Sequence, residues 1–441
     1  MTIGILGGGI AALSLAHFLD EDVIIFEKNK ALGGLCRSFD FYGVPFDIGP
    51  HIVFSKDNEV LNLHNSLTQM NTFQRLNRIL IGQNLVKYPL ENNLYQLDAV
   101  DRDRCVIEFQ SNPYAEMQAK NMQQFFLSYF GEGITDLYLY PYNKKIWKLD
   151  PTFLDLQMVD RIPRPPAKDV IEGAQGNPKE GYTHQAVFTY PIYGGFQSIV
   201  DSYVNLLLKK NTKFELDFEV KSIEKSSQKW LITSQNNKTC SVDKLVSTLP
   251  LPYLGQLTNA PAHILAKSSE ALYNSIHIVM LRYSRDVLVD QFGLYVPDPQ
   301  AIFHRISRLN FLGDGYGGNS GELNLMVEIT FRQGSYVSKL SNEELVQRCV
   351  LDLEKIGIIE AKFFKKSKVQ TFSHSYVIYD LGHRERTDSL ISYFATMGIT
   401  CHGRFGKFEY QNSDAVVSDS IRLAKQMNKA SRLDSSTLEG L

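Results

Sequence analysis

The chain has 441 residues, of which 44% are hydrophobic and 21% charged, so it can bury a large core in two or three globular domains. Its formal net charge of −2 comes without a block of like charges, which argues against nucleic acid or an anionic membrane as the main partner. The longest apolar runs have the length of strands and the chain begins with one, so we expect no membrane helix and no cleaved signal peptide. Five scattered cysteines predict a reducing, cytoplasmic setting and no structural metal.

The first stretch of the chain predicts a dinucleotide-binding βαβ unit. A strand at 2–6 leads into the glycine run 7–9 and a helix over 10–19. Such a turn brings the backbone close to a pyrophosphate, and the helix N-terminus offers it free N–H groups. A second strand, 23–26, ends at Glu27, where a carboxylate that binds a ribose is expected. The alternative is an ordinary βαβ unit with a glycine-rich turn.

A second glycine pair, Gly33-Gly34, follows at a distance that a plain nicotinamide-binding unit does not show. It resembles the second nucleotide-contacting loop of the glutathione-reductase-like flavoproteins, where an arginine then runs beside the cofactor.

Residues 44–55 predict an alternating strand that Gly49-Pro50 interrupts. His51 in this strand is, taken alone, better explained as a core histidine. A helix and then a hairpin around 82–84 complete this part.

The middle of the chain predicts a helical region and then a return to the first sheet. The pattern is helical from about 98 to 140, and 141–147 is expected to be a polar–aromatic loop. A helix over 196–207 and antiparallel strands between 213 and 241 follow. They lead to an apolar strand at 243–250 that belongs with the first sheet.

The last part predicts further strands and two helices. Several strand-like stretches lie between 275 and 335. A serine cap with a glutamate three residues later marks the start of a helix over 341–355. A final helix is expected to end near Met427.

Together these elements predict an α/β fold. It combines a glutathione-reductase-like Rossmann FAD-binding domain, an inserted helical region and an antiparallel-sheet substrate domain. The FAD-binding domain is expected to be discontinuous, because a late strand returns to the first sheet. The expected divisions are 1–90, 190–265 and 385–430 for the FAD-binding domain, 95–185 for the helical insertion, 266–384 for the substrate domain and 431–441 for a tail.

Several narrower motifs carry a family resemblance. They are IGPHIVFS (48–55), YPLENN (88–93), PYNKKIW (141–147), Arg161, FHR (303–305) and GRFGKFEY (403–410). With the N-terminal unit, they resemble the flavin-dependent UDP-galactopyranose mutases, particularly the eukaryotic type. The wider resemblance is to the amine oxidases and protoporphyrinogen oxidase. It extends from residue 2 to about 427 and is patchy in 95–130 and 255–345.

The resemblance implies FAD, active in its reduced form, and a set of residues around it. The implied cofactor-binding residues are Gly7, Gly9, Ile10, Ala11, Glu27, Lys28, Gly33, Gly34, Arg37, Ser38, Gly49, His51, Val220, Arg404, Asn412 and Asp414. His51 would lie beside the isoalloxazine ring. Arg75 matches an arginine implicated in binding a reductant, which could be NADPH or NADH.

The resemblance also implies a substrate site. Arg161 and Arg305 match two arginines that clamp the substrate diphosphate, and with His51 they form the implied catalytic set. The implied substrate-binding residues are Tyr88, Asn143, Trp147, Tyr295, Tyr376 and Tyr410. For any one arginine or tyrosine, the alternative is a surface ion pair or a core aromatic residue.

The implied activity is that of an isomerase. It would interconvert the pyranose and furanose forms of a nucleotide-diphosphate sugar similar to UDP-galactose and galactofuranose, with flavin N5 as nucleophile and no net redox change. The chain could form a homo-oligomer. One alternative is an FAD-dependent oxidoreductase of the amine-oxidase or protoporphyrinogen-oxidase kind. Another is a non-enzymatic binder on the same fold, like the GDP-dissociation inhibitors, which have lost an intact FAD site.

Three positions depart from the family pattern. Leu90 and Glu91 stand where the mutases carry Phe and Gln against uracil, and Gly293 replaces a large aromatic residue. A carboxylate at the base could instead accept hydrogen bonds from guanine or cytosine. The sequence therefore leaves the base and the sugar open.

Overall fold

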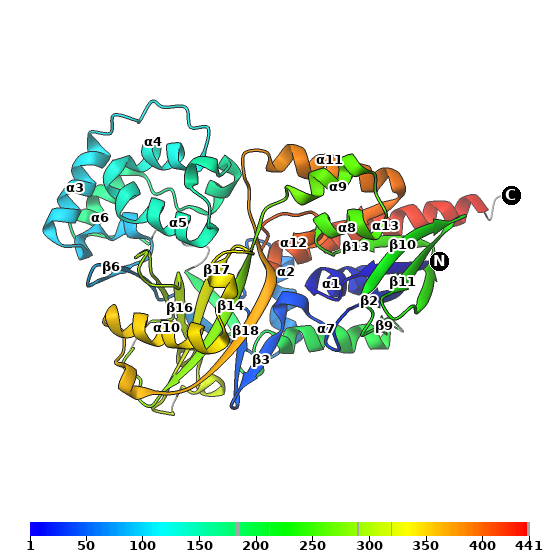
Figure 1. Cartoon of the computed structure of the whole chain (residues 1–441), viewed down its shortest axis with the longest axis horizontal. Helices are drawn as coiled ribbons and strands as arrows, with labels where there is room; N and C mark the ends of the chain where they lie inside the picture. Colours follow the sequence, from blue (N-terminus) through cyan, green and yellow to red (C-terminus); the bar gives the residue numbers. More distant parts are fainter. Residues whose placement is uncertain (181–185, 211, 289–290, 319, 439–441) are drawn as a thin grey trace.

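The computed structural model of the chain describes all residues except 181–185, 211, 289–290, 319 and 439–441, and for Arg161 and 433–438 it describes the backbone alone. The molecule is elongated (Figure 1). One end holds a parallel sheet with its helices and the first residues of the chain, and the other end holds a larger sheet beside a group of helices. The predicted α/β fold class is confirmed.

The first sheet has five parallel strands in the order β19-β13-β1-β2-β9. Their bounds are β1 (Thr2–Leu6), β2 (Asp22–Phe26), β9 (Lys213–Glu215), β13 (Lys244–Ser247) and β19 (Ile399–Cys401). The inner strands are short apolar runs buried by helices, as parallel strands generally are. Three distant parts of the chain supply this sheet. The prediction of antiparallel strands from residue 213 on was wrong for β9, because α7 returns the chain beside β2 in the parallel direction.

Three helices pack together on this sheet. They are α1 (Ile10–Phe18), α7 (Gln197–Lys209) and α13 (Ser413–Leu438). The hydroxyl groups of Ser14 in α1 and Ser420 in α13 hydrogen bond at 2.8 Å. The last helix continues beyond the predicted end at Met427, so the expected tail 431–441 is helical to Leu438 and then lies outside the described residues.

A smaller antiparallel sheet and four helices complete this end of the molecule. The sheet contains β10 (Val220–Ser226), β11 (Lys229–Ser234) and β12 (Thr239–Val242), as predicted. The helices are α8 (Leu251–Leu257), α9 (Ala262–Ser269), α11 (His383–Met397) and α12 (Gly403–Gly406).

The larger sheet has seven strands in the order β18-β14-β17-β16-β15-β6-β7. Their bounds are β6 (Asn77–Ile81), β7 (Asn84–Lys87), β14 (Tyr273–Tyr283), β15 (Gly293–Tyr295), β16 (Arg305–Arg308), β17 (Leu323–Phe331) and β18 (Phe364–Val377). All neighbouring pairs are antiparallel except β15 and β6. Helix α10 (Asn342–Lys355) packs on β14 and β18 and begins with the predicted capping box.

The helical group at the same end contains α3 (Ala99–Gln110), α4 (Met122–Ile134), η4 (Thr135–Leu139), α5 (Tyr140–Trp147) and α6 (Ala167–Ala174). The prediction of a loop at 141–147 was wrong. Pro141 is tolerated in the first turn of α5, and Trp147 Nε1 donates to Asn143 Oδ1 at 2.9 Å across one helical turn.

Short elements connect the two ends. They are α2 (Asn58–Leu67), the hairpin of β3 (Ser38–Phe41) and β4 (Val44–Asp47), and the antiparallel pair of β5 (Met70–Gln74) and β8 (Val187–Pro191). The hairpin β6–β7 pairs through β15 with the larger sheet. We therefore propose that the first segment of the nucleotide-binding domain ends before Asn77 instead of at residue 90.

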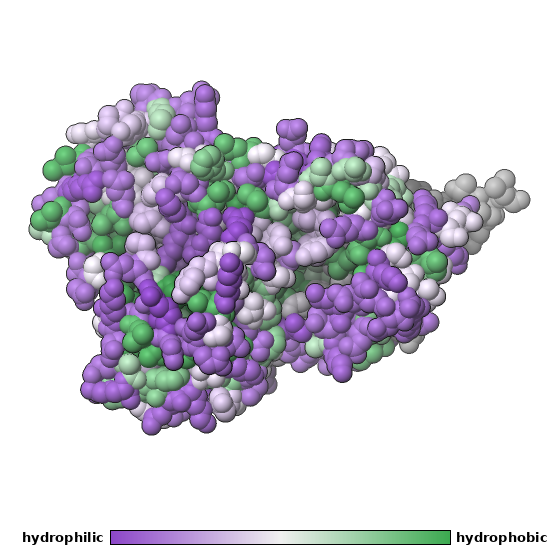
Figure 2. All heavy atoms as spheres, in the orientation of Figure 1, coloured by the Kyte–Doolittle hydropathy of each residue, from purple (hydrophilic) through white to green (hydrophobic). Residues whose placement is uncertain are grey.

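The surface gives no sign of a broad apolar face in the view of Figure 2. Hydrophobic side chains lie there in small groups among hydrophilic ones. Within the described part of the chain, no helix combines the length and the apolar character needed to cross a membrane.

Candidate active site

The N-terminal glycine run forms a tight turn between β1 and α1. Gly7 has a φ of +90°, and α1 begins after Gly9. No side chain in the described part of the chain caps this helix end, so its first N–H groups remain for a ligand. The Gly8 N–H donates to Glu27 Oε2 at 2.8 Å, which holds the buried carboxyl group beside the turn. The turn thus combines an anion-binding helix end with an adjacent acid.

Two other predicted segments meet this turn. The Gly33 N–H donates to a carbonyl oxygen of the glycine run at 2.7 Å, and a Cβ atom on Gly34 would lie 3.1 Å from Gly9 Cα. A Cβ atom on Gly403 would lie 2.5 Å from Ala11 Cβ. The structure therefore brings segments from the start and the end of the chain to the N-terminus of α1.

The structure also describes four other residues of the predicted cofactor set. Ile10 is buried in the first turn of α1, and Lys28 is exposed. Arg37 Nε donates to the Gly34 carbonyl oxygen at 3.2 Å. Val220 is half-buried at the start of β10.

A buried carboxyl group, Asp47, fixes the turn that carries Gly49–His51. Asp47 accepts hydrogen bonds from Ser38 Oγ and Tyr190 OH, both at 2.6 Å, and from the Phe196 N–H at 3.1 Å. Burial raises the pKa of Asp47 to about 6, against the lowering effect of these donors. The donors belong to β3, β8 and the start of α7. Asp47 therefore ties three segments to the end of β4.

His51 lies just behind the wall of the main cavity. Its two neighbours in the sequence line the cavity, while the centroid of its own ring lies 5.5 Å from that of Phe196. Burial, together with the charges of Arg404 and Arg305, lowers the pKa of His51 to about 4. The imidazole is therefore neutral at physiological pH.

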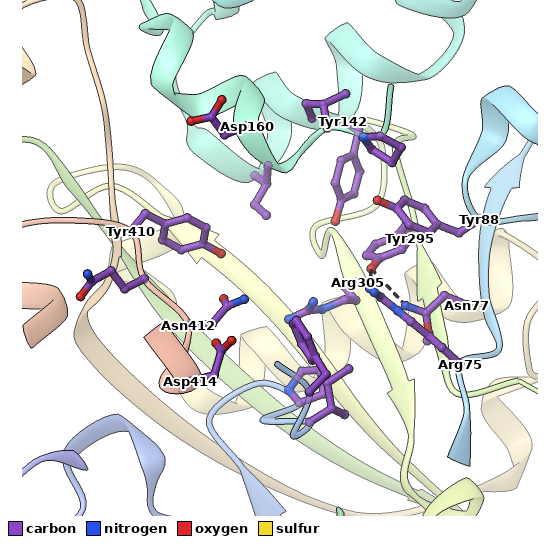
Figure 3. A pocket seen from close by; sticks show the side chains of 18 of the residues that line it. Arg75, Asn77, Tyr88, Tyr142, Asp160, Tyr295, Arg305, Tyr410, Asn412 and Asp414 are labelled. Atoms are coloured by element: carbon purple, nitrogen blue, oxygen red, sulfur yellow. Dashed lines mark hydrogen bonds between the residues drawn. The ribbon is translucent and has the colours of Figure 1, made fainter. Parts of the chain in front are cut away.

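The main cavity has a volume of about 640 Å³ and opens next to the Gly49–His51 turn. Eight of the predicted site residues line it: Tyr88, Asn143, Trp147, Tyr295, Arg305, Tyr410, Asn412 and Asp414. Arg75, Glu91 and Gly293 line it as well. Figure 3 shows Asn412 and Asp414 on one side, Arg75 and Tyr88 on the other, and Arg305 between them.

Arg305 reaches the cavity from β16 and is held by a buried partner. Its Nε and Nη2 atoms donate to the two carboxylate oxygens of Glu328 on β17, at 2.5 and 2.6 Å. Glu328 is fully buried, and the side chain of Arg305 is 22% exposed. A Cβ atom on Gly49 would lie 3.1 Å from Glu328 Oε2, so the pair also abuts the Gly49–His51 turn. This forked geometry fixes the guanidinium plane and leaves Nη1 for a ligand.

A second arginine, Arg75, holds a tyrosine on the far wall. Arg75 Nη2 donates to Tyr295 OH at 3.1 Å, and the guanidinium lies 5.5 Å from the centroid of the Tyr88 ring. Burial raises the pKa of Tyr295, but the charges of Arg75 and Arg305 and the hydrogen bonds with Arg75 and Asn77 together outweigh it and lower this pKa below its usual value. Arg75 thus lies in the cavity wall, where it orients the Tyr295 phenol.

The opposite wall is a group of aromatic residues. The Trp147 ring meets the rings of Tyr410 and Tyr376 nearly edge-on, at centroid distances of 5.4 and 5.8 Å. Arg404 lies 4.3 Å from the centroid of Tyr410. Tyr376 is buried and, unlike Tyr410, is not among the described residues that line the cavity. It supports this wall from behind.

The side chain of Arg161, the expected second arginine of the clamp, lies outside what the structure describes. Its backbone ends η6 (Leu156–Arg161). The adjacent Asp160 and Ile162 both line the cavity.

Comparison with known proteins decides the family. Residues 7–389 match the family described as flavin containing amine oxidoreductase. The chain belongs to this family. Membership implies a flavin cofactor, and the glycine backbones gathered at the N-terminus of α1 form a cradle that fits one.

Individual relatives of the chain are distant. It is 25% identical over 248 residues to dTDP-fucopyranose mutase from Escherichia coli, a match that covers 52% of this chain and 59% of that protein. The chain thus spans less than two thirds of the length of the curated relatives it matches.

Solved structures confirm the fold. A reduced UDP-galactopyranose mutase superposes with a TM-score of 0.88 at 22% identity, covering 97% of this chain and 93% of that one. A fatty acid isomerase from P. acnes superposes with a TM-score of 0.65 at 16% identity, covering 96% and 98%. The predicted resemblance to a flavin mutase within the amine-oxidase-like superfamily is confirmed.

We expect Gly34→Ala to reduce the flavin content of the purified protein. Gly34 has a φ of +57°, and a Cβ atom there would lie 3.1 Å from Gly9 Cα, closer than an ordinary van der Waals contact. The measurement is the ratio of flavin to protein absorbance after purification. Gly43→Ala is the matched control, because Gly43 also has a positive φ, of +86°, but a Cβ atom there meets nothing within 4 Å. An alanine with a positive φ costs roughly 1–2 kcal/mol in either variant. Equal flavin contents in the two variants would therefore contradict the close approach at Gly34.

Two important residues escaped the sequence analysis. Asp47 lies in a segment that was interpreted only as a strand, and Glu328 lies in the middle of the apolar β17. A signal for Glu328 was present, because an acid in an otherwise buried strand needs a charged or donating partner. The partner itself, Arg305, could not be identified without the pairing of β16 with β17.

Proposed function

We propose that this chain is an FAD-dependent mutase that interconverts the pyranose and furanose forms of a nucleotide-diphosphate sugar. The observation that carries the proposal is the position of Arg305: it lies in the cavity, next to the turn at Gly49 and between the Asp414 side and the Tyr88 side. A sugar bound beside the Gly49 turn and a diphosphate bound at Arg305 would follow the order of these two groups along the cavity. Two similar proteins, a UDP-galactopyranose mutase and a dTDP-fucopyranose mutase, support it.

The cofactor site is proposed to hold FAD along the residues that converge at α1. The α1 N-terminus would bind the pyrophosphate, and the carboxyl group of Glu27 would bind a ribose hydroxyl. Asp414 and Asn412 in the cavity wall would contact the ribityl chain. When bound and reduced, the flavin would supply N5 as the nucleophile for the anomeric carbon.

The chain's own residues would hold the leaving diphosphate. Arg305 Nη1 would donate to it, while Glu328 keeps the guanidinium in place. Tyr295 and Tyr410 would donate from opposite walls, and Arg161 is proposed to complete the clamp. Retaining the diphosphate close to the sugar makes its return an intramolecular step, which is strongly favoured over recapture from solution. The partner substrate is therefore a nucleotide sugar.

The test is a panel of nucleotide sugars incubated with dithionite-reduced protein. We expect UDP-galactose or dTDP-fucose to be converted between pyranose and furanose forms, as followed by chromatography, and the oxidised protein to be inactive. NADPH and NADH, the proposed physiological reductants, can replace dithionite in a parallel reaction. Substrate-dependent reduction of the flavin with release of peroxide would contradict the proposal.

The second candidate is an oxidoreductase, and membership of the amine oxidoreductase family is the observation that favours it. Such an enzyme needs a hydride donor at the flavin but no cation for a diphosphate. The cavity wall, however, contains both Arg75 and Arg305. The peroxide measurement above separates the two candidates.

A further inference from the structure

The C-terminal end of α5 lies against the larger sheet. Helix α5 contacts β17, and Figure 1 shows it on the side of the helical group that faces this sheet. The last carbonyl groups of a helix have no partners within the helix itself. In α5, the N–H of Lys148 satisfies the Lys144 carbonyl oxygen, at 3.1 Å. The carbonyl groups of Ile146 and Trp147 need donors from elsewhere.

Asn274, on β14, supplies these donors. Its Nδ2 atom donates to the carbonyl oxygens of Ile146 and Trp147, at 3.0 and 2.8 Å, and the residue is fully buried. Arg332 also reaches the Trp147 carbonyl oxygen, at 3.4 Å. The Oδ1 atom of Asn274 has no hydrogen-bond partner among the described residues. Since an unpaired buried acceptor is unfavourable, the two donated bonds are what this amide contributes.

The residue held in this way, Trp147, belongs to the wall of the cavity. Its Nε1 atom donates to Asn143, which lines the cavity as well. Asn274 also lies directly opposite Tyr376 in the pairing of β14 with β18, at the point where the register of this pairing shifts. The rings of Trp147, Tyr376 and Tyr410 thus come from three separate parts of the chain. Asn274 lies where the first two of these parts join.

We propose that Asn274 is a positioning residue that holds Trp147, and through it Asn143, in place against a bound nucleotide-diphosphate sugar. This inference rests on the proposed function. Asn274 is not among the described residues that line the cavity, so it acts through Trp147 without touching the substrate. The wall would meet the ligand equally before and during the reaction. The expected effect is therefore on substrate binding more than on kcat.

A second attachment keeps α5 on the sheet when the Asn274 amide is removed. Lys145 Nζ donates to the carbonyl oxygens of Val296 and Asp298, just after β15, at 2.8 and 2.5 Å. These two bonds hold the body of the helix, whereas Asn274 holds its last turn. Loss of the Asn274 donors is therefore expected to displace Trp147 while the chain still folds.

The test replaces Asn274 with aspartate, which has the same shape but turns an oxygen atom toward the two carbonyl oxygens. Asn310→Asp is the matched control. Asn310 is also buried, and its Nδ2 atom donates to the carbonyl oxygens of Gly317 and Glu322 at 2.6 and 2.7 Å, but it does not line the cavity. Each exchange removes two buried hydrogen bonds, so we expect both variants to unfold at similarly lowered temperatures. A purely structural role of Asn274 would make the two variants alike in every other measurement.

Tryptophan fluorescence reports the position of Trp147 without any substrate. The chain has two tryptophans, so Trp230→Phe, at the other end of the molecule on β11, leaves Trp147 alone. In the wild-type cavity wall Trp147 is 6% exposed. In the flavin-loaded Trp230→Phe background, we expect Asn274→Asp to raise the quenching of Trp147 by acrylamide by about twofold or more, because the last turn of α5 opens locally. Asn310→Asp is expected to leave this quenching unchanged.

Substrate binding is the second measurement. We expect Asn274→Asp to raise the dissociation constant of UDP-galactose from the oxidised, flavin-loaded protein, and its KM with the reduced protein, by about tenfold. The kcat is expected to stay within about threefold of wild type. Asn274→Ser keeps one hydroxyl donor and leaves space for a bridging water molecule, so it should lie between wild type and Asn274→Asp in both measurements.

Equal acrylamide quenching and equal dissociation constants in Asn274→Asp and Asn310→Asp would overturn the proposal. If Asn274→Asp does not fold, the same comparison between Asn274→Ser and Asn310→Ser decides the question. A rise in KM without a change in Trp147 fluorescence would also contradict the proposal, since Asn274 is assigned to act through Trp147.

The outcomes also separate this inference from the proposed function. A wild type that binds UDP-galactose without converting it would refute the mutase, and the fluorescence and dissociation constants of the variants would still decide the role of Asn274. Conversion by wild type, together with indistinguishable Asn274 and Asn310 variants, would refute the role of Asn274 alone. A protein that binds no nucleotide sugar would refute both.

Discussion

Replacing Glu328 with glutamine is expected to lower the apparent free energy of unfolding by about 3–5 kcal/mol. Glu328 is fully buried and bonds through both oxygens to Arg305, whose side chain is 22% exposed. Without the carboxylate, a desolvated guanidinium loses its counter-charge, which costs far more than the loss of a surface ion pair. The measurement is urea denaturation of the flavin-loaded protein, followed by fluorescence.

The matched control is Asp136→Asn, which removes one of the two acidic partners of Arg104, in an ion pair with side chains 44% and 56% exposed. We expect this exchange to change stability by at most about 1 kcal/mol. The double variant Arg305→Met with Glu328→Met should be more stable than Glu328→Gln, because no unpaired charge remains, yet it should have lost the proposed mutase activity. A Glu328→Gln protein as stable as the control variant would show that the pair is not desolvated as described.

The elements best predicted from the sequence are those determined by neighbouring residues. The turn at Gly7–Gly9, the capping box at Ser341 and the hairpin of β6 and β7 are all specified by a few adjacent residues, and the structure contains all three. Local signals fix the type of an element and its ends. They do not fix which strand a segment pairs with, which is why the antiparallel direction predicted for β9 was wrong.

The candidate site shows the same limit. The resemblance placed Tyr88, Tyr295, Arg305 and Tyr410 in one pocket, and the structure gathers all four around one cavity. Glu328, which holds Arg305, and Asp47, which fixes the adjacent Gly49–His51 turn, were missed, because the sequence does not show which distant donors each acid meets. Tyr190, for example, is 143 residues from the carboxyl group that it contacts.

That carboxyl group, Asp47, carries the second large expected effect. Asp47→Ala removes the common acceptor of Ser38 Oγ, Tyr190 OH and the Phe196 N–H. Each buried donor left without an acceptor costs about 1–3 kcal/mol, so we expect a total loss of about 3 kcal/mol or more. Since the Gly49–His51 turn follows directly, the variant should also be purified with little flavin. Thermal unfolding and the ratio of flavin to protein absorbance measure the two effects.

Asp40→Ala provides the control from the same hairpin. Asp40 is exposed and accepts a hydrogen bond only from the Gly43 N–H, at 2.9 Å, among the bonds that the described residues make to its side chain. Its loss should change neither flavin content nor the unfolding temperature by much, because water replaces the carboxylate as acceptor. Asp47→Asn should fall between the two, since the amide keeps one acceptor oxygen but turns an N–H₂ group toward donors. Full flavin content in Asp47→Ala would mean that the turn is held by its other contacts, and the role assigned to Asp47 would then be wrong.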